Sequence, residues 1–446
     1  MKNNIRTNEL CYATLSSDNP SSYNTYINQG GYLAWKKILS NLPSKKVIID
    51  TVIDSGLRGR GGAGFPTGRK WSFIDQTSDV VKYLVCNADE SEPGTCKDRD
   101  ILRHNPHALI EGMLIASYAI GAETAYCYLR GEFMDDVYTT FKSALHEAYT
   151  NKLIGKNILN TNISIELYDL IGAGAYIVGE ETAMLESIEG KKGFPRFKPP
   201  FPAVKGLFGS PTIINNVETL ASIPKIISNG PEWFKSAGTK DSPGFKCFSV
   251  SGHVNSPGNY EVPLGTPFKK LLELAGGVRE GNILKAVIPG GSSVPVVPGD
   301  IMLETNMDYE SLANAGSMLG SGAIIIMDET TNMVEVAHRI SRFYYSESCG
   351  QCTPCREGTG WMYRIIDRIL KGDGNLEDIR TLESIPGMIA GSTICALGDA
   401  AAMPVESFLR HYKSEFLKYI KYVSEQEEIL RASTENNKNE FPLYKK

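Results

Sequence analysis

Four cysteines carry the most specific chemical signal in the sequence. Cys349, Cys352 and Cys355 have the spacing C-x2-C-x2-C, and Cys395 lies 40 positions after Cys355. Three closely spaced thiolates can occupy three corners of a cubic iron–sulfur cluster, while a distant cysteine supplies the fourth ligand. Zinc sites usually draw their ligands from two separated cysteine pairs, or from cysteine and histidine. We therefore predict an iron–sulfur cluster here, with zinc binding and free thiols as the alternatives.

Residues 56–68 form a glycine-rich segment, with six glycines in 13 positions. The spacing G-x-G-x-x-G begins at Gly59, but in dinucleotide-binding sites this motif follows a strand, and here the preceding Lys46–Ser55 has a helical pattern. Glycine-rich backbone can approach a ligand closely, and Lys70 adds a cation beside two aromatic residues. The segment is therefore predicted to bind a cofactor that carries a phosphate and a ring; a flexible surface loop is the alternative.

An acidic segment directly follows the first predicted buried strand. Asn87–Gly94 comes after Val81–Cys86 and contains Asp89, Glu90 and Glu92. In open α/β sheets ligands bind at the carboxyl ends of the strands. Three acids so close together repel one another, which a purely structural turn seldom requires. We predict binding residues here, against the alternative of a solvated acidic turn.

Two adjacent carboxylates begin another predicted helix. Glu180 and Glu181 lie in Gly179–Thr182, after the predicted strand Ile163–Ile171. The helix dipole alone favours acids in a first turn. Alternatively, they bind ribose hydroxyls or a flavin ring, and a carboxylate facing a 2′-OH would select NAD over NADP. The sequence leaves both explanations open.

The segment Asn215–Thr219 also begins a helix. Asn216 is a suitable N-cap, with Thr219 at the third helical position. The free N–H groups of such a helix end also bind phosphate. Capping alone and phosphate binding both remain possible.

The elements that must position these residues fall into three regions. Between residues 45 and 230, helices alternate with short apolar strands, which indicates βαβ units and a mostly parallel sheet. The elements expected there are helices at Lys46–Ser55, Ile101–Gly121 and Asp135–Tyr149, and strands at Val81–Cys86, Thr124–Leu129 and Ile163–Ile171.

The two later regions differ in type. A small α+β region is expected to contain the helix Pro267–Ala275 and the strands Cys247–Val254, Asn259–Val262, Leu284–Ile288, Val294–Val297 and Ala323–Met327. From Asn332 the pattern is helical and predicts a bundle of Met333–Tyr345, Gly358–Leu370, Leu376–Ile385 and Ala401–Val423. The fold class is thus α/β and α+β, in several domains.

The composition excludes several classes of protein. The chain has 446 residues, 42% of them hydrophobic, with a formal net charge of −5, so no basic surface indicates nucleic-acid binding. No stretch approaches 18 uninterrupted apolar residues, and the N-terminus lacks the apolar region of a signal peptide. Nine cysteines, an odd number, favour a reducing compartment over a disulfide scaffold. Neither a Ser/His/Asp arrangement nor a histidine metal site is evident, so nucleophilic hydrolysis is not expected.

In their order and separation, five of these segments resemble the flavoprotein (51-kDa-type) subunit of NADH:quinone oxidoreductase, respiratory complex I. They are Gly56–Gly68 with Lys70, Asn87–Gly94, Gly179–Thr182, Asn215–Thr219 and Ser348–Arg356. The resemblance covers about residues 30–425. It implies an N-terminal segment (1–67), a Rossmann-like FMN/NADH domain (68–236), a ubiquitin-like β-grasp domain (237–330), a helical bundle with a [4Fe–4S] cluster (331–430) and a polar tail (431–446).

The resemblance also implies roles for individual residues. The cofactor-binding residues would be Gly59, Gly61, Lys70, Asn87, Asp89, Tyr176, Glu180, Asn215, Asn216 and Thr219. Phe65, Phe73 and Phe201 would pack around the adenine, and Lys70, Glu92 and Glu181 would take part in catalysis, with the two acids at the nucleotide. Cys349, Cys352, Cys355 and Cys395 would hold the cluster. NADH would pass a hydride to FMN, and electrons would then leave singly through the cluster towards quinone.

Partners and location follow from the same resemblance. A thioredoxin-like [2Fe–2S] subunit and a larger multi-cluster subunit are expected neighbours, with membrane contact only through partners. The expected location is the cytoplasmic side of the inner membrane, in preference to the mitochondrial matrix. The alternatives are a diaphorase subunit of an NAD-linked hydrogenase or formate dehydrogenase and, in another class, a non-catalytic electron-transfer or assembly subunit. Only Cys11 precedes the glycine-rich segment and no cysteine follows Cys395, which favours the complex I subunit over the diaphorases.

Overall fold

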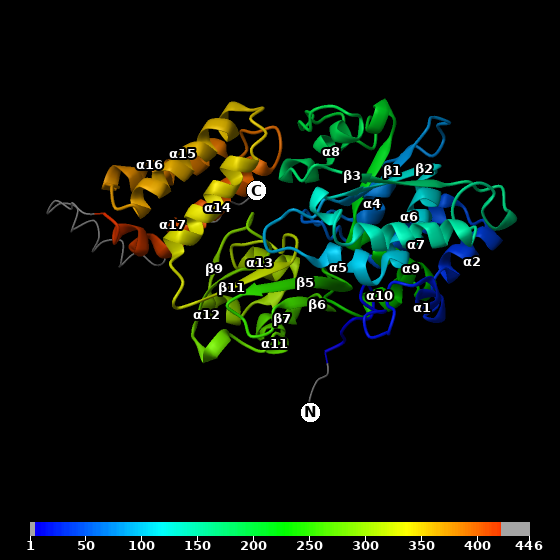
Figure 1. Ribbon diagram of the computed structural model, residues 1–446, viewed down its shortest axis with the longest axis horizontal. Coiled ribbons are helices and arrows are strands. Elements are labelled where there is room, and N and C mark those ends of the chain that lie inside the picture. Colours follow the sequence, from blue (N-terminus) through cyan, green and yellow to red (C-terminus); the bar gives the residue numbers. More distant parts are fainter. Residues whose placement is uncertain (1–4, 421–446) are drawn as a thin grey trace. The chain divides into compact units, whose positions relative to one another are not determined.

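The computed structural model describes residues 5–420 and divides into two compact units between Glu329 and Thr330 (Figure 1). The first unit contains a parallel sheet and a mixed sheet with their helices, and residues 330–420 of the second unit form helices and loops. This combination confirms the predicted α/β and α+β fold class with a C-terminal helical region. Within residues 5–420, no helix is both long and apolar enough to cross a bilayer.

Short helices precede the first sheet. They are α1 (Tyr23–Asn28), α2 (Leu33–Asn41), α3 (Lys45–Ser55) and α4 (Thr67–Trp71). The predicted helix at Lys46–Ser55 is confirmed as α3, which ends at Gly56 in the left-handed conformation (φ +68°) that glycine tolerates. The glycine-rich segment therefore follows a helix, and its G-x-G-x-x-G spacing does not mark the first turn of a Rossmann fold.

The parallel sheet of the first unit has the strand order β3–β2–β1–β4. Its strands are β1 (Tyr83–Ala88), β2 (Thr124–Leu129), β3 (Glu166–Ile171) and β4 (Thr212–Asn216). Cys86 of β1 lies opposite Cys127 of β2 and Asn215 of β4. Because the strands are parallel and in register, their carboxyl ends lie along one edge of the sheet. All three strands predicted for this region are confirmed to within about three residues at their ends.

The single helix predicted at Ile101–Gly121 is wrong. Two helices occupy this region, α5 (Lys97–His104) and α6 (Pro106–Ile120), separated at Asn105 (φ −143°, ψ 50°). Proline lacks the N–H that would continue a helix, and its ring disfavours helical backbone in the residue before it. Pro106 therefore begins a new helix instead of extending α5.

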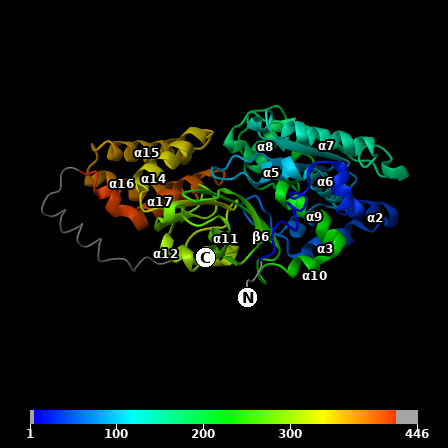
Figure 2. The ribbon, with the colours of Figure 1, turned by 60° about the horizontal axis from the view of Figure 1, so that its bottom comes forward.

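The helices of this part pack closely on one another. α6 crosses α9 (Val217–Asn229) at Gly112, where a Cβ atom would lie only 1.9 Å from the carbonyl oxygen of Leu220. Figure 2 shows α2, α3, α9 and α10 (Pro231–Lys235) together on one part of this unit. The remaining helices are α7 (Tyr138–Thr150) and α8 (Glu181–Ile188). α7 begins three residues later than predicted, because residues 134–137 form turns.

The second sheet is mixed, with the strand order β6–β5–β11–β8–β9. Its strands are β5 (Phe245–Gly252), β6 (Gly258–Pro263), β8 (Leu284–Ile288), β9 (Val297–Pro298) and β11 (Ala323–Asp328), and β7 (Thr266–Pro267) pairs with β10 (Asn306–Met307). The associated helices are α11 (Phe268–Leu274), α12 (Gly299–Leu303) and α13 (Tyr309–Asn314). The strand predicted at Val294–Val297 is largely wrong, because only Val297 is extended in β9 and the chain turns before it, with the N–H of Val294 donating to Gly291.

Residues 8–12 are joined to the second sheet through a buried acid. The carboxylate of Glu261 on β6 accepts the backbone N–H groups of Leu10 (3.0 Å) and Cys11 (2.6 Å). Leu10, Cys11 and Glu261 are each at least 98% buried. Nothing in the sequence pattern predicted this contact, which joins positions about 250 residues apart.

The second unit contains four helices within the described residues. They are α14 (Met333–Glu347), α15 (Thr353–Leu370), α16 (Leu376–Ile389) and α17 (Leu397–Leu417), which pack on one another as predicted. α15 begins earlier than predicted because Pro354 fits a first helical turn. The end predicted for α17, Val423, and the predicted polar tail lie outside the described residues.

Candidate functional site

The predicted polar segments meet at the carboxyl edge of the parallel sheet. Asn87 of β1 lies opposite Asn216 of β4. The side-chain amide of Asn87 donates to the carbonyl oxygen of Gly179 (2.9 Å), so the segment that follows β3 reaches β1. Asp89 is buried beside this contact, and a Cβ atom on Gly179 would lie 3.4 Å from its carboxylate. The structure thus brings together residues from three of the predicted segments.

The glycine-rich segment lies against the start of α9. The N–H of Arg60 donates to the hydroxyl of Thr219 (2.8 Å). A Cβ atom on Gly61 would lie 3.0 Å from the Cβ of Asn216, and the N–H of Gly59 donates to the carbonyl oxygen of Phe65 (2.8 Å). The backbone of the segment therefore closes on itself next to a helix N-terminus, where free N–H groups favour an anion.

The two asparagines at the end of β4 have different partners. Asn215 accepts a hydrogen bond from the indole N–H of Trp71 (2.8 Å). Asn216 caps α9 by accepting the N–H of Glu218 (3.0 Å), and its amide group donates to Asp98 (2.6 Å). The predicted capping role of Asn216 is confirmed, since this contact satisfies one free N–H of the helix.

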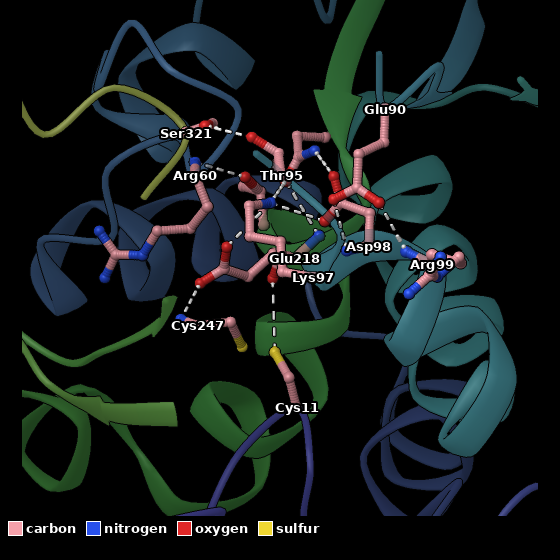
Figure 3. A network of polar contacts seen from close by, with 12 residues as sticks. Cys11, Arg60, Glu90, Thr95, Lys97, Asp98, Arg99, Glu218, Cys247 and Ser321 are labelled. Atoms are coloured by element: carbon pink, nitrogen blue, oxygen red, sulfur yellow. Dashed lines mark hydrogen bonds and ion pairs between the residues drawn. The ribbon is translucent and has the colours of Figure 1, made fainter. Parts of the chain in front are cut away.

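A buried group of charged residues lies behind this helix end (Figure 3). Glu218 is paired with Lys97 (3.0 Å) and Lys246 (2.6 Å), and Lys97 also contacts Asp98 (2.7 Å). Burial raises the pKa of Glu218, but Lys246 and Lys97 outweigh this and lower it. Burial lowers the pKa of Lys246 to about 8. Since Asp98 in turn holds Asn216, these charges fix the position of the α9 cap.

Two lysines and two acids form a second charged group, at the start of α8. Lys70 contacts Glu181 (2.9 Å) and the carbonyl oxygen of Ile214 (2.9 Å), while Lys198 contacts both Glu180 and Glu181 (2.9 Å each). Glu180 caps α8 by accepting the N–H of residues 182 and 183. Burial raises the pKa of Glu181, but Lys70 and Lys198 outweigh burial and lower it to about 2. Glu181 is therefore ionised at neutral pH.

Glu92 is held by three donors. Its Oε2 atom accepts the hydroxyl of Tyr176 (2.7 Å). Its Oε1 atom accepts the backbone N–H of Ser293 (2.8 Å) and the hydroxyl of Ser292 (3.2 Å). The two serines belong to the second sheet region, so the candidate site includes a segment that the sequence did not indicate.

The three predicted aromatic residues are exposed. Phe65, Phe73 and Phe201 are 44%, 52% and 57% exposed, and the ring centroids of Phe65 and Phe73 are 6.0 Å apart. Exposed aromatic faces of this kind can stack against a flat ligand. Phe201 follows two cis peptide bonds, Lys198–Pro199 and Pro199–Pro200, and Lys198 lies at the acids of α8.

The four clustered cysteines lie in the loops and helix starts of the second unit. Cys352 precedes α15, Cys355 lies in its first turn, and Cys395 lies just before α17. The hydroxyl of Ser348 is 3.2 Å from the sulfur of Cys355, which is buried. Within the part of the chain that the structure describes, no three of these sulfurs lie within 4.8 Å of one another.

Comparison with known proteins gives these sites a family. Three family models match the chain: the Nuo51 FMN-binding domain at residues 52–225, the SLBB domain at 247–297 and the NADH-ubiquinone oxidoreductase-F iron-sulfur binding region at 335–419. The F subunit of NADH-quinone oxidoreductase in Rickettsia bellii is 56% identical over 373 residues, which is 83% of this chain and 89% of the relative. The chain belongs to this family. The corresponding protein of Rickettsia typhi is also 56% identical, over 84% of this chain and 89% of the relative.

Solved structures show the same fold in a related setting. A chain of an NAD+-reducing [NiFe]-hydrogenase in the H2-reduced state matches with a TM-score of 0.80 and 32% identity, over 96% of this chain and 71% of that chain. The air-oxidised state of an NAD+-reducing [NiFe]-hydrogenase matches with a TM-score of 0.77. This chain and the hydrogenase chain thus share one fold. The fold is therefore compatible with both predicted functions, the complex I subunit and the hydrogenase diaphorase.

The residues present fit the two cofactors that the matching family models name. The backbone at Gly61 and Gly179 approaches Asn216 and Asp89 so closely that a Cβ atom would lie 3.0 Å and 3.4 Å from them, and Gly61 lies beside the N-terminus of α9, whose free N–H groups favour an anion. Within the described residues, the buried Nε and Nη1 atoms of Arg60 and the Oγ1 atom of Thr67 have no hydrogen-bond partner. The glycine-rich segment therefore has polar atoms that could hydrogen-bond to a ligand. The thiol donors of the second unit suit iron.

Several contacts of the candidate site could not be predicted from sequence motifs. Lys198 gave no local signal, because it lies 17 residues after Glu181 and only folding brings it to the acids. Lys97 and Asp98, behind Asn216, resemble ordinary helix-start residues. Ser292 and Ser293 carry no local signal, since only folding brings them to Glu92.

Proposed function

We propose that the chain oxidises NADH as the flavoprotein subunit of an NADH-quinone oxidoreductase, with FMN in the first unit and a [4Fe–4S] cluster in the second. The observation that carries this conclusion is the meeting of the glycine-rich segment, the start of α9 and the acids of α8 at one edge of the parallel sheet. The match to the Rickettsia NADH-quinone oxidoreductase proteins over most of the chain supports it. When bound, FMN accepts a hydride from NADH and releases electrons singly.

In this proposal the glycine-rich backbone and the α9 helix end hold the FMN phosphate and ring. The residues assigned to the flavin are Gly59, Gly61, Lys70, Asn87, Asp89, Glu180, Asn215, Asn216 and Thr219. Asn87 and Asp89 present polar atoms at the end of β1, and Thr219 fixes the glycine-rich backbone through Arg60. Lys70 places a positive charge at the same edge and would stabilise negative charge that develops on a reduced ring.

The nucleotide is assigned to the acids and exposed aromatic rings. Phe65, Phe73 and Phe201 would stack on the adenine, and Glu92, Tyr176 and Glu181 would bind the nucleotide's polar groups. An ionised Glu181 accepts from a ribose 2′-OH and repels a 2′-phosphate, which favours NADH over NADPH. These side chains orient the rings and need not transfer protons.

Cys349, Cys352, Cys355 and Cys395 are assigned as the residues that would hold the cluster, which would supply one-electron transfer towards partner subunits. The proposed partners are a thioredoxin-like [2Fe–2S] subunit and a larger multi-cluster subunit. The proposed location is the cytoplasmic face of the inner membrane, in a peripheral arm joined to the membrane through partners.

The proposed domain boundaries are 68–236 for the flavin domain, 237–330 for the β-grasp domain and 331–430 for the bundle. The division of the chain between Glu329 and Thr330, close to the start of the bundle, supports the last of these.

A second candidate is a diaphorase subunit of a soluble hydrogenase, favoured by the structural match to the NAD+-reducing [NiFe]-hydrogenase. The two candidates share the NADH-to-cluster chemistry and differ in their partners. Purification of the chain from its native membrane or cytosol, with identification of co-purifying subunits, separates them.

An anaerobic NADH titration of the purified protein tests the shared chemistry. We expect bleaching of the flavin band near roughly 450 nm and an EPR signal from the reduced cluster, with a much weaker response to NADPH. A flavin that NADH does not reduce would contradict the assignment of Glu92 and Glu181. Absence of both flavin and iron after anaerobic preparation would leave the non-catalytic assembly role.

A further inference from the structure

The loop between β8 and β9 (Pro289–Val296) reaches the candidate nucleotide site from the second sheet. Two of its contacts fall on one atom: Oε1 of Glu92 accepts the N–H of Ser293 (2.8 Å) and the hydroxyl of Ser292 (3.2 Å). Tyr176 occupies the other carboxylate oxygen, at 2.7 Å. A carboxylate with donors on both oxygens is held in one orientation.

The loop is itself held firmly. The N–H of Gly291 donates to the carbonyl oxygen of Ala323 on β11 (2.9 Å). The N–H of Ser321 donates to the carbonyl oxygen of Gly290 (3.0 Å). Ser292 is 2% exposed. The donors that contact Glu92 are therefore pre-positioned by the sheet.

Gly291 fits closely against Glu92. Its φ of +99° suits glycine, and a Cβ atom there would lie 2.6 Å from Cγ and 2.8 Å from Oε1 of Glu92. Such distances are too short for any real contact, so a side chain at Gly291 must displace the Glu92 side chain.

A second contact anchors the turn that carries Glu92. The hydroxyls of Thr95 and Ser321 are 2.6 Å apart (Figure 3), and a Cβ atom on Gly94 would lie 3.1 Å from Ile325 of β11. The turn from Glu92 to Thr95 thus rests on the second sheet at both ends.

We propose that the β8–β9 loop positions Glu92 for the nicotinamide nucleotide, so that the β-grasp region forms part of the NADH site and sets its affinity. Ser292, Ser293 and Gly291 are positioning residues that act through Glu92. The inference rests on the proposed NADH-oxidising function and adds to it a structural role for the region between β5 and β11.

The test uses Gly291→Ala in the full, cofactor-loaded protein, with Gly316→Ala as the matched control. Gly316 lies in the same region with a similar left-handed φ of +78°, and a Cβ atom there meets nothing within 4 Å. Both variants place an alanine at a positive φ, and only Gly291→Ala displaces the side chain of Glu92.

We expect the dissociation constant for NAD+, measured by calorimetry on the oxidised protein, to rise by about tenfold in Gly291→Ala and to stay within about twofold in Gly316→Ala. Steady-state kinetics should show the loss in KM more than in kcat.

A background of Glu92→Ala shows whether the loop acts through this acid. There the clash is gone, so Gly291→Ala and Gly316→Ala should bind NAD+ equally well. A tenfold loss from Gly291→Ala that persists in this background, or no loss in the native background, would overturn the proposal.

Glu92→Ala alone tests the underlying function. Unchanged NAD+ affinity in this variant would remove Glu92 from the nucleotide site, whereas weak binding by Glu92→Ala with normal binding by Gly291→Ala would refute only the role of the loop. If Gly291→Ala does not fold, Ser292→Ala replaces it, with an expected loss of about threefold that disappears in the Glu92→Ala background. Equal affinity of Ser292→Ala and the native protein would then count against the proposal.

Discussion

At the scale of single residues, the charges at the start of α8 determine what can bind there. Two acids and two lysines meet within 2.9 Å contacts, so their net charge is close to zero before any ligand binds. Lys70 is shared between Glu181 and the carbonyl oxygen of Ile214 in the middle of β4. In the proposed site this positive charge lies beside both the acid assigned to the nucleotide and the residues assigned to the flavin.

Lys70→Met removes that charge while keeping a side chain of similar length. We expect the NADH-driven rate to fall by about tenfold to a hundredfold, because a preorganised positive charge is lost where negative charge develops. Stopped-flow reduction of the flavin by NADH is the measurement. Lys240→Met, at an exposed lysine outside the site, is the control, and equal rates for the two variants would remove Lys70 from the mechanism.

Glu181→Gln tests the choice between NADH and NADPH. Because the pKa of Glu181 is about 2, the carboxylate is fully ionised from pH 6 to pH 8, and it would gain a proton only as the pH falls towards 2. Any change in the preference between pH 6 and pH 8 should therefore come from the 2′-phosphate of NADPH, whose second pKa is about 6, and should persist in Glu181→Gln. In Glu181→Gln the ratio of kcat/KM for NADPH to that for NADH should rise by about tenfold, because a like-charge repulsion is removed. An unchanged ratio, or a pH dependence of the native preference that disappears in Glu181→Gln, would contradict the assignment.

At the scale of secondary structure elements, α9 joins the proposed flavin site to the buried charged residues behind its N-terminus. Its cap, Asn216, accepts the N–H of Glu218 and donates to Asp98, which contacts Lys97. The N-terminus of α9 is thus fixed from the side opposite the glycine-rich segment. The position of the free N–H groups at the N-terminus of α9 therefore depends on the contacts of Asn216 and Asp98.

Asn216→Ala should destabilise the protein and weaken flavin binding together. Loss of a cap costs about 1 kcal/mol, and Asp98 loses a buried partner as well. Asn332→Ala is the matched control, since Asn332 caps α14 in the second unit by accepting the N–H groups of Val334 and Glu335. We expect both variants to unfold at lower temperature and only Asn216→Ala to retain less FMN. Full FMN content in Asn216→Ala would show that the α9 cap does not support the flavin.

Local patterns predicted most elements, and the errors have local causes. Asn216 and Gly56 were identified correctly as helix boundaries, because capping depends on residues next to each other in the sequence. The break between α5 and α6 was missed although Pro106 was visible, since the apolar spacing continued through it. The contact between Ser293 and Glu92 joins positions 201 residues apart and left no trace in either segment.

At the scale of the whole molecule, the two predicted cofactor sites belong to separate units. Every residue assigned to FMN and NADH precedes Glu329, and the four cluster cysteines follow Thr330. The proposed cluster site has a strong local signal, because three of its proposed ligands are close in sequence. The proposed flavin site draws on segments from residue 59 to residue 219, and the resemblance to a family, more than any one motif, predicted that these segments act together.

Cys355→Ser should therefore remove the cluster and spare the flavin. Loss of one thiolate leaves the cluster with three protein ligands, so iron content and the EPR signal of the reduced cluster should fall strongly. The first unit contains the flavin residues, so FMN content and bleaching by NADH should persist at native levels in a single-turnover experiment. Cys96→Ser is the control, because Cys96 lies in the first unit and is not a predicted ligand; it should keep both iron and flavin. Loss of FMN together with iron in Cys355→Ser would mean that the units depend on each other for folding, whereas full iron content would remove Cys355 from the cluster.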